Sequence, residues 1–346
     1  MLDERKQKIL KAIIDDFIIT AEPVGSRTIA RKYNIGISPA TIRNEMSDLE
    51  EMGYLEQPHT SAGRIPSDKG YRFYVDFLMK LRKLTPEEIK NIKDVSLYKK
   101  INGIEELLEQ TTKVLSQITR YTSVALGPQL KKTTLKHLQL VPVENKRVLM
   151  VIVTNSGLVE HKLLSLPKNV TESDLERVSN IINDKLSGLA IGDISDDVIS
   201  NVKKEIIGFS SDVFDMAIEF LLKNLQIYTD SKLFLYGTTN IFNLPEFRDI
   251  EKARNFLSIL EDKELLCEIL SNSFMSKDIV ITIGSENKYQ EIKNCSVITT
   301  TYKINGKTIG SIGVVGPTRM EYSKVVSIVR FLSENMSQLI SKILNN

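Results

Sequence analysis

The segment from residue 38 to residue 49 carries side chains that can read DNA, arranged around an apolar stripe. Ile42, Met46 and Leu49 recur at the spacing of one helix face, which we expect to face a core. On the opposite side, a guanidinium can bind guanine through two hydrogen bonds, and a carboxamide can bind adenine in the same way. The residues that such a helix would expose to DNA are Ala40, Thr41, Arg43, Asn44 and Ser47. The alternative is a solvated helix face, which Glu45 and Asp48 fit better.

Neighbouring groups could add contacts to the DNA backbone. Ser38 and Thr41 would lie at a helix N-terminus, where hydroxyls and free backbone N–H groups suit phosphate. The loop 58–64 combines small residues with Arg64, a cation that could enter a minor groove or contact phosphate. The same loop holds His59 and Thr60, and further contacts could come from Arg27, Arg31, Lys32 and Arg72. The alternatives are an ordinary hairpin loop and isolated surface charges.

Short helices and a hairpin would position these residues. Ser38 followed by Pro39 is a strong helix start, because serine can cap and proline at the first helical position loses no hydrogen bond. Gly53 is placed to end that helix in the left-handed conformation. The predicted elements are a helix over 5–20, a short helix capped by Ser26, a helix from 38, strands at 54–56 and 64–66, and a helix from Ser67. This order predicts a winged helix-turn-helix domain over 1–80.

The rest of the chain predicts an α+β fold with a helical interruption. A lysine-rich linker is expected over 81–102. Strand patterns with helices at 103–121 and 171–187 predict the first part of a domain over 103–191, and strands with a terminal helix predict its second part over 261–346. The block 192–260 is mainly helical, with a short strand at 233–236. The other predicted strands are 123–126, 138–143, 148–154, 158–166, 279–283, 297–302 and 308–315, with hairpin turns at 155–157 and 305–306.

Composition argues against several classes of protein. The net charge is +2, and the first 82 residues hold 13 Lys and Arg against 12 Asp and Glu, so any DNA interface depends on where the charges sit. No apolar run approaches the roughly 18 residues of a membrane helix, and the charged N-terminus is not a secretory signal, so we expect a cytoplasmic protein without membrane contact. Cys267 and Cys295 are expected to be buried thiols.

Motifs for catalysis are missing from the sequence. The histidines His59, His137 and His161 are too scattered for a zinc or catalytic cluster, and neither G-x-S-x-G nor a phosphate-binding loop is present. Gly310, Gly313 and Gly316 do not match a dinucleotide fingerprint and are expected to serve strand packing. We therefore expect no enzyme activity and no cofactor or metal.

The chain resembles the HrcA family of heat-inducible transcription repressors. The first 80 residues carry the resemblance most strongly, and it continues more loosely beyond them. The matching runs are Val24-Gly25-Ser26-Arg27-Thr28, Ser38-Pro39-Ala40-Thr41-Ile42-Arg43-Asn44-Glu45-Met46, Leu49-Glu50-Glu51-Met52-Gly53-Tyr54-Leu55, His59-Thr60-Ser61-Ala62-Gly63-Arg64-Ile65-Pro66, Gly70-Tyr71-Arg72, Ser123-Val124-Ala125-Leu126-Gly127-Pro128 and Gly313-Val314-Val315-Gly316-Pro317-Thr318-Arg319-Met320.

The resemblance implies both an architecture and a function. It implies a winged-helix DNA reader, a GAF-like domain and an inserted dimerisation domain, which we place at 192–260. It also implies repression of groE- and dnaK-type heat-shock chaperone operons by a homodimer that binds the CIRCE inverted repeat in double-stranded DNA. Activity would be modulated by the GroEL-type chaperonin.

An alternative function is a regulator gated by a small molecule that binds in the GAF-like domain. GAF-like folds often have such a pocket, but this is an analogy of fold alone. A deep pocket with convergent polar groups would favour the alternative, and a closed core would argue against it.

Overall fold

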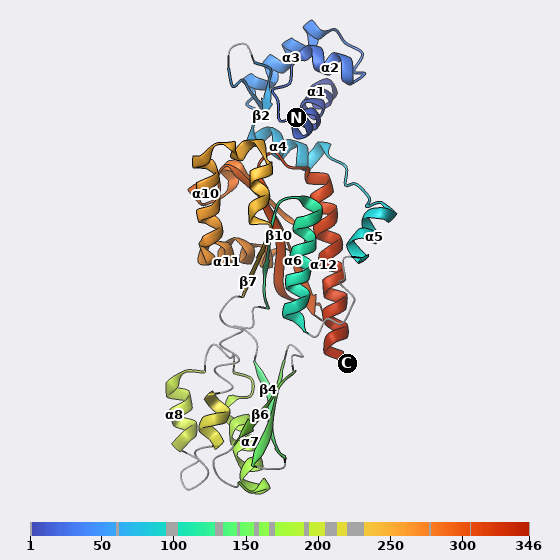
Figure 1. The fold of residues 1–346 in the computed structure, drawn as a ribbon. Helices are drawn as coiled ribbons and strands as arrows, with labels where there is room; N and C mark the ends of the chain where they lie inside the picture. Colours follow the sequence, from blue (N-terminus) through green and yellow to red (C-terminus); the bar gives the residue numbers. More distant parts are fainter. Residues whose placement is uncertain are drawn as a thin grey trace. The chain divides into compact units, whose positions relative to one another are not determined.

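The computed structural model describes two compact units of the chain (Figure 1). Unit 1 comprises residues 1–125, 234–301 and 311–335, and unit 2 comprises 126–233, 302–310 and 336–346. The residues described below are 2–59, 62–94, 103–128, 134–143, 146–155, 159–165, 170–189, 194–204, 213–219, 232–276, 278–304 and 306–345.

Unit 1 begins with three helices that form close to where the sequence predicts them. They are α1 (Glu4–Thr20), α2 (Ser26–Lys32) and α3 (Pro39–Glu51). Ile9, Ile13 and Ile14 of α1 are completely buried. The expectation that Ser26 caps the second helix is wrong, because Gly25 occupies the N-cap position and Ser26 is the first helical residue.

Both ends of α3 are fixed by local hydrogen bonds. The Ser38 hydroxyl accepts from the backbone N–H of Thr41 at 3.1 Å, as its capping role requires. At the other end Gly53 adopts φ +78°, so its N–H reaches the carbonyl of Glu50 and the next N–H reaches that of Leu49. These caps set where the helix starts and stops, and thereby which of its residues face outward.

A small β-hairpin follows α3. Strands β1 (Leu55–Glu56) and β2 (Ile65–Pro66) pair antiparallel, and Val24 bonds through both backbone groups to Arg64 at 2.9 Å. The Ser67 hydroxyl caps α4 (Asp68–Phe73) by accepting from Gly70 N–H, and it donates to the Gly53 carbonyl at 2.6 Å. The end of α3 is therefore tied to the start of α4, which continues as the π-helical turn η1 (Tyr74–Leu78).

The predicted linker is partly helical. Helix α5 (Pro86–Asp94) forms within it, and Ile92 is 1% exposed. Residues 95–102 lie outside the described part of the chain. Pro86 therefore opens a helix within the predicted linker 81–102, and the role of this segment as a linker stays a prediction.

The core of unit 1 is a five-stranded sheet in the order β7-β3-β10-β9-β8. Its strands are β3 (Thr122–Leu126), β7 (Leu233–Tyr236), β8 (Val280–Ile283), β9 (Cys295–Ile304) and β10 (Lys307–Pro317). Nearly every residue of β9 is buried, as expected for a strand covered on both faces. In Figure 1, helices α6 (Ile104–Thr119) and α12 (Tyr322–Asn345) lie on one side of the strands, and α10 (Ile250–Glu261) and α11 (Lys263–Ser271) on the other. Short helical turns connect them: η3 (Thr238–Asn243), η4 (Pro245–Arg248), η5 (Asn272–Met275), η6 (Gly284–Glu286) and η7 (Gln290–Ile292).

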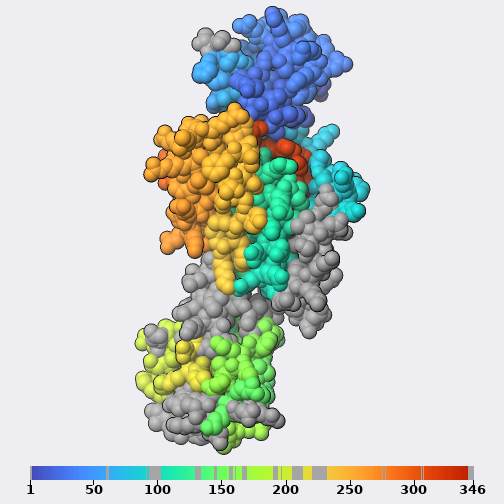
Figure 2. All heavy atoms as spheres, viewed as in Figure 1, coloured from blue at the N-terminus to red at the C-terminus, as the bar shows by residue number. Residues whose placement is uncertain are grey.

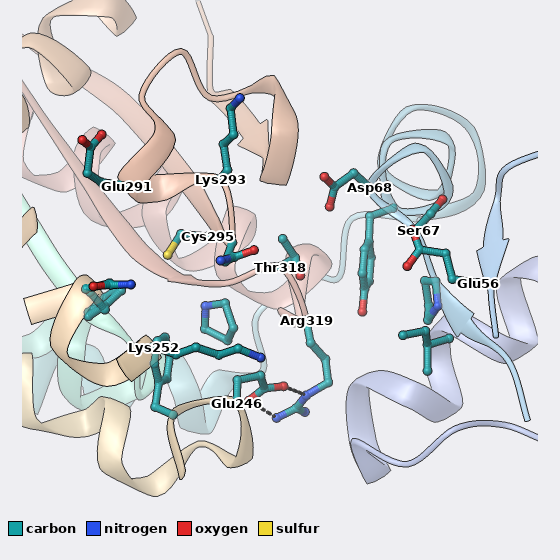
Figure 3. A pocket seen from close by; sticks show the side chains of 18 of the residues that line it. Glu56, Ser67, Asp68, Glu246, Lys252, Glu291, Lys293, Cys295, Thr318 and Arg319 are labelled. Atoms are coloured by element: carbon teal, nitrogen blue, oxygen red, sulfur yellow. Dashed lines mark hydrogen bonds and ion pairs between the residues drawn. The ribbon is translucent and has the colours of Figure 1, made fainter. Parts of the chain in front are cut away.

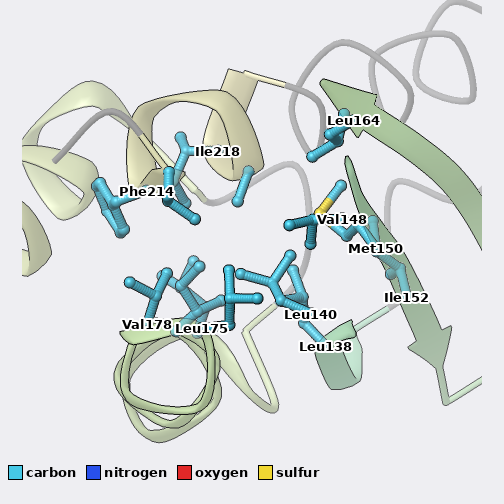
Figure 4. Close-up of a cluster of buried hydrophobic side chains, with 14 of the residues drawn as sticks. Leu138, Leu140, Val148, Met150, Ile152, Leu164, Leu175, Val178, Phe214 and Ile218 are labelled. Carbon is cyan, nitrogen blue, oxygen red and sulfur yellow. The ribbon is translucent and has the colours of Figure 1, made fainter. Parts of the chain in front are cut away.

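Unit 2 contains an antiparallel sheet as well as helices. Its elements are β4 (Leu135–Val143), β5 (Arg147–Thr154), β6 (Val159–Ser165), α7 (Glu172–Leu186) and α8 (Asp196–Lys204), with a further helical stretch at 213–219. Leu138, Leu140 and Met150 point from the strands toward Leu175 of α7 and toward Phe214 (Figure 4). Strands and helices thus share one apolar core.

This shared core corrects the predicted insertion. The compact unit that interrupts unit 1 spans 126–233, whereas the predicted insertion is 192–260, and among the described residues of this unit three strands accompany the helices. Strands β4–β6 and α7, assigned above to the first part of the GAF-like domain, belong to unit 2, whereas residues 234–260 belong to unit 1. Strand periodicity shows that one face is buried but does not tell which helices bury it. The predicted turn at 155–157 and that at 305–306 lie partly outside the described residues.

Candidate nucleic-acid interface

Helix α3 presents a polar face opposite its buried stripe. Ile42, Met46 and Leu49 are at most 4% exposed, as predicted from their spacing. The outward residues that were predicted to contact DNA divide into two groups. Ser38, Ala40, Arg43 and Asn44 are exposed, whereas Thr41 and Ser47 are half-buried. The guanidinium and carboxamide needed for base readout are therefore accessible side by side.

The acidic side of α3 is neutralised by α1. The ammonium of Lys6 lies 2.7 Å from the carboxylate of Glu45 and 3.0 Å from that of Asp48, and Arg5 approaches Glu45 at 3.3 Å. The hydrogen bond with Glu45, followed by that with Asp48, raises the pKa of Lys6, so the ammonium stays charged. The two carboxylates that seemed to argue for a plain solvated helix face are thus compensated within the domain.

Three predicted cations surround one hollow beside α3. This hollow, of about 460 Å³, is lined by Arg27, Arg43 and Arg64 together with residues of α2, α3 and the hairpin loop. Within the described part of the chain, Arg27 and Arg43 form no ion pair. A local excess of positive charge therefore exists although the net charge of the first 82 residues is only +1.

Arg64 is held in place by α3. Its Nε donates to Oε2 of Glu50 at 2.8 Å, its Nη2 lies 2.7 Å from the same oxygen, and its side chain is 18% exposed. In this structure the Arg64 side chain is engaged by Glu50, and its predicted contact with a minor groove or a phosphate stays a prediction. The Arg64 charge fixes the returning strand of the hairpin against α3, a contact between residues 14 positions apart.

Arg72 lies in a different place from the one predicted. Its guanidinium donates to both carboxylate oxygens of Glu286, at 2.6 and 2.5 Å, and to the carbonyl of Ile281 at 2.6 Å. It also pairs with Asp76 at 3.1 Å. Each nitrogen of the Arg72 guanidinium therefore has a partner within unit 1, either on η1 or beside β8, and its predicted contact with DNA stays a prediction.

The remaining predicted residues fall at the edges of this face. His59 is exposed on the hairpin loop, where its carbonyl accepts from Ala62 N–H at 2.8 Å, and Thr60 lies outside the described residues. Arg31 is exposed, whereas Lys32 pairs with Asp16 at 2.6 Å.

Lys6 is the residue of this face that sequence reasoning missed. It contacts Glu45 across 39 residues of chain, and no local pattern marks such a partner.

Comparison with known proteins decides the family. The family model described as "HrcA protein C terminal domain" matches residues 105–326. A protein of Acetivibrio thermocellus named "Heat-inducible transcription repressor HrcA" is 49% identical over 344 residues, which cover 99% of this chain and 97% of that protein. A protein of the same name from Carboxydothermus hydrogenoformans is 50% identical over 340 residues, or 98% of each chain.

The chain belongs to the HrcA family of heat-inducible transcription repressors. A solved structure described as "Crystal structure of a hypothetical protein at 2.2 A resolution" shares the fold of this HrcA-family chain. Its TM-score is 0.65 at 23% identity, with 99% of this chain and 100% of that chain covered. The family model covers the regulatory portion, whereas the two relatives also span α1 to α4, the elements that carry the candidate interface.

Neither a metal site nor a membrane span is found in the described part of this HrcA-family chain. Among the described residues, no three His, Cys, Asp or Glu side chains are grouped so as to hold a metal. Cys295 is buried, which raises the pKa of its thiol to about 12, and Cys267 is half-buried. None of the described helices combines the length and apolarity that a membrane span needs.

Proposed function

We propose that this HrcA-family chain represses groE- and dnaK-type chaperone operons by binding the CIRCE inverted repeat in double-stranded DNA. It would act in the cytoplasm as a homodimer, without enzymatic activity. The observation that carries the proposal is the outward face of α3, where Arg43 and Asn44 are exposed while Lys6 compensates the neighbouring carboxylates. Family membership supports the class of function, transcription repression, and the outward face of α3 supports the way in which DNA would be read.

In this proposal residues 1–80 act as a winged helix-turn-helix with α3 in the major groove. Arg43 reads a guanine and Asn44 an adenine, with Ala40, Thr41 and Ser47 packed against base edges. Ser38 and the N-terminus of α3 meet a phosphate, and Arg27 and His59 contact the backbone beside it. Arg64 supports the hairpin, and Arg72 has no part in DNA binding.

An inverted repeat calls for a two-fold dimer, because each half-site is read by one copy of the same helix. We assign self-association to unit 2, which replaces 192–260 as the inserted dimerisation domain, and we assign a GAF-like fold to the sheet and helices of unit 1 that follow α5. The face of β4–β6 turned away from the core exposes apolar side chains, a feature typical of protein interfaces. These are Val141, Val143, Val159 and Leu163, each between 37% and 51% exposed.

The same apolar face offers a physical basis for modulation by a GroEL-type chaperonin. A monomer would leave it uncovered, and uncovered apolar surface is what exposes a chain to aggregation. Chaperonin engagement would keep monomers available for pairing. When heat occupies the chaperonin with other unfolded proteins, the active dimer would decline and repression would lift.

The proposal is tested by a titration at fixed salt of the purified chain against a CIRCE-type repeat and a scrambled duplex, with and without chaperonin. Arg43→Ala should weaken binding to the repeat by about 1–3 kcal/mol, and binding to the scrambled duplex much less. Arg254→Ala, which removes an exposed arginine of α10, is the matched control. Equal binding to both duplexes, unaffected by Arg43→Ala, would refute operator reading.

Self-association has its own test. Leu163→Asp should shift the sedimentation equilibrium toward monomer and lower operator affinity, because dimer formation raises the effective concentration of the second reading helix. The control is Ser165→Asp, a polar position further along β6. A monomeric variant that binds the repeat as tightly as the parent protein would exclude the dimer mechanism.

A further inference from the structure

Arg319 links the core of unit 1 to the first helix of the proposed DNA reader, which comprises α1 to η1. It lies shortly before α12, in the run 313–320 that carries part of the family resemblance and has no role in the proposed function. Its guanidinium donates to the Ile18 carbonyl, 301 residues away in the chain, and to both carboxylate oxygens of Glu246. One side chain thus joins the end of α1, η4 and the segment before α12.

The end of α1 has no cation of its own. The last carbonyl groups of a helix lack partners within the helix, and a positive charge beside them is favourable. The last turn of α1 contains no basic residue, and the chain leaves the helix through Ala21 in the left-handed conformation. Arg319 therefore supplies, from the core, the charge that this helix end lacks. Its side chain is 12% exposed, so the contact is screened little by salt.

The space between the reader and the core is incompletely filled. The space-filling view shows the blue N-terminal lobe against the gold segment that carries α10 (Figure 2), and a hollow of about 770 Å³ is lined by residues of both. In Figure 3 the Arg319 side chain reaches Glu246 in this region, with Lys252 on one side and Ser67 and Asp68 of the reader on the other. Because the hollow interrupts close packing, the orientation of the reader depends on individual polar contacts.

Other polar contacts with the core start from the C-terminal part of the reader and the segment that follows it. Arg72 pairs with Glu286 at 2.5 Å, and Asp68 accepts from a backbone N–H of the same turn at 2.7 Å. Residues 80–82 are bonded to the hydroxyl of Ser323 at 2.6 and 3.0 Å. A body that is attached at one end can still rotate about that attachment. The contact of Arg319 with α1 is a second point of attachment, which restricts this rotation.

We propose that Arg319 is a positioning residue that sets one orientation of the DNA reader on the core of unit 1. It holds α1, and α3 packs on α1, so the direction in which Arg43 and Asn44 point is fixed relative to the core. In a two-fold dimer the same restraint acts on both copies, and the pair of reading helices then fits one separation of the half-sites. This consequence for half-site spacing rests on the proposed function, whereas the orientation of the reader does not.

Distances between two spin labels on the full chain measure this orientation directly. The labels are attached to Lys8→Cys, at a position of α1 that is 68% exposed, and to Lys263→Cys, at an exposed position of α11. The chain also carries Cys267→Ser, keeps the buried Cys295, and is diluted with unlabelled chain so that only pairs within one chain are measured. The parent should give one narrow distance distribution, and Arg319→Ala a broader one. An unchanged distribution in Arg319→Ala overturns the proposal.

Two further variants separate positioning from folding. Arg330→Ala removes an arginine of α12 that pairs with Asp278 of the core at 3.0 Å, and it should leave the distance distribution as in the parent. The double variant Arg319→Met, Glu246→Gln removes both charges together, so no carboxylate is left unpaired, and it should broaden the distribution as Arg319→Ala does. Broadening by Arg330→Ala equal to that by Arg319→Ala, or a narrow distribution in the double variant, contradicts the positioning role.

Inverted repeats with altered spacing measure the consequence for DNA binding. The parent should bind a CIRCE-type repeat at least about tenfold more tightly than a repeat whose spacer is longer by about five base pairs, half a turn of B-DNA. Arg319→Ala should reduce this ratio several-fold, while its affinity for a single half-site stays that of the parent, because no DNA contact is removed.

The two measurements fail independently. If Arg319→Ala broadens the label distances but leaves the spacing ratio unchanged, the positioning role stands and its link to half-site spacing is refuted. If the parent does not discriminate the repeat from a scrambled duplex, the proposed function fails, while the label distances still decide the role of Arg319.

Discussion

Arg72 and Glu286, which are 214 residues apart in the chain, form a two-bond ion pair that joins the end of α4 to the turn after β8. The same turn is held a second time, because the Asp68 carboxylate accepts from Ser285 N–H at 2.7 Å. From the sequence alone, Arg72 is predicted to be a further cation that contacts the DNA backbone. The structure instead gives it a positioning role between the N-terminal elements and the sheet of unit 1.

Arg72→Ala should therefore lower the free energy of unfolding without removing a DNA contact. The loss should be about 1–3 kcal/mol, since hydrogen bonds to a charged group are broken and Glu286 is left half-buried without its partner. The plot of log affinity for nonspecific DNA against log salt should keep its slope. A slope reduced by about one unit would instead mean that Arg72 neutralises a phosphate.

The Arg72–Glu286 pair also predicts a dependence of stability on pH. Burial opposes ionisation of Glu286, but hydrogen bonds from Arg72 and from Ile283 N–H hold its pKa below the ordinary 4.5. A carboxyl whose pKa is lowered by folding stabilises the fold above its unfolded pKa, and this contribution is lost as the pH falls through the folded pKa. Urea unfolding of the parent and Glu286→Gln proteins should therefore differ most above pH 4.5 and converge in acid. A difference that persists unchanged to pH 2 would show that the carboxylate charge is not responsible.

The sequence was sufficient to predict features of the fold that depend mainly on residues close together in the chain. The cap at Ser38, the left-handed Gly53 and the helix start at Ser67 each depend on contacts within a few positions, and all three form as expected, whereas the cap expected at Ser26 falls on Gly25. Arg72–Glu286 and Lys6–Glu45 depend on where distant segments meet, which periodicity does not encode. The predicted limits of the inserted domain differ from those of unit 2 for the same reason. The residue pattern of β4–β6 is equally compatible with either domain.

Lys6 should matter for DNA binding although it lies on α1. Lys6→Met leaves the carboxylates of Glu45 and Asp48 uncompensated beside the proposed reading face, so operator affinity should fall several-fold, and more at low salt. Lys8→Met removes the same charge from an exposed lysine whose ion-pair partner is Glu4 of α1 itself, and it should have little effect. Equal losses in the two variants, measured at two salt concentrations, would mean that net charge alone is at work.

Gly63 should be needed for the hairpin to pack against the segment before α2. A Cβ atom at this position would lie 2.5 Å from the carbonyl carbon and oxygen of Val24, so alanine cannot fit while Val24 keeps its two backbone bonds to Arg64. Gly63→Ala should therefore destabilise the fold by about 1–3 kcal/mol, as overpacking does. It should also weaken operator binding, because the hollow that brings Arg27, Arg43 and Arg64 together is lined by Gly63.

Gly25→Ala is the matched control for stability. A Cβ atom there meets nothing within 4 Å and the backbone φ is −93°, so alanine is accommodated. Loss of a favourable N-cap residue is offset by the lower entropy of the unfolded chain, so the free energy of unfolding should change by less than about 1 kcal/mol. Both variants can be followed by urea unfolding and by titration with the repeat. Equal stability of Gly63→Ala and Gly25→Ala would show that the hairpin is free to move away from Val24, and the close approach at Gly63 would then have no bearing on how the hairpin meets DNA.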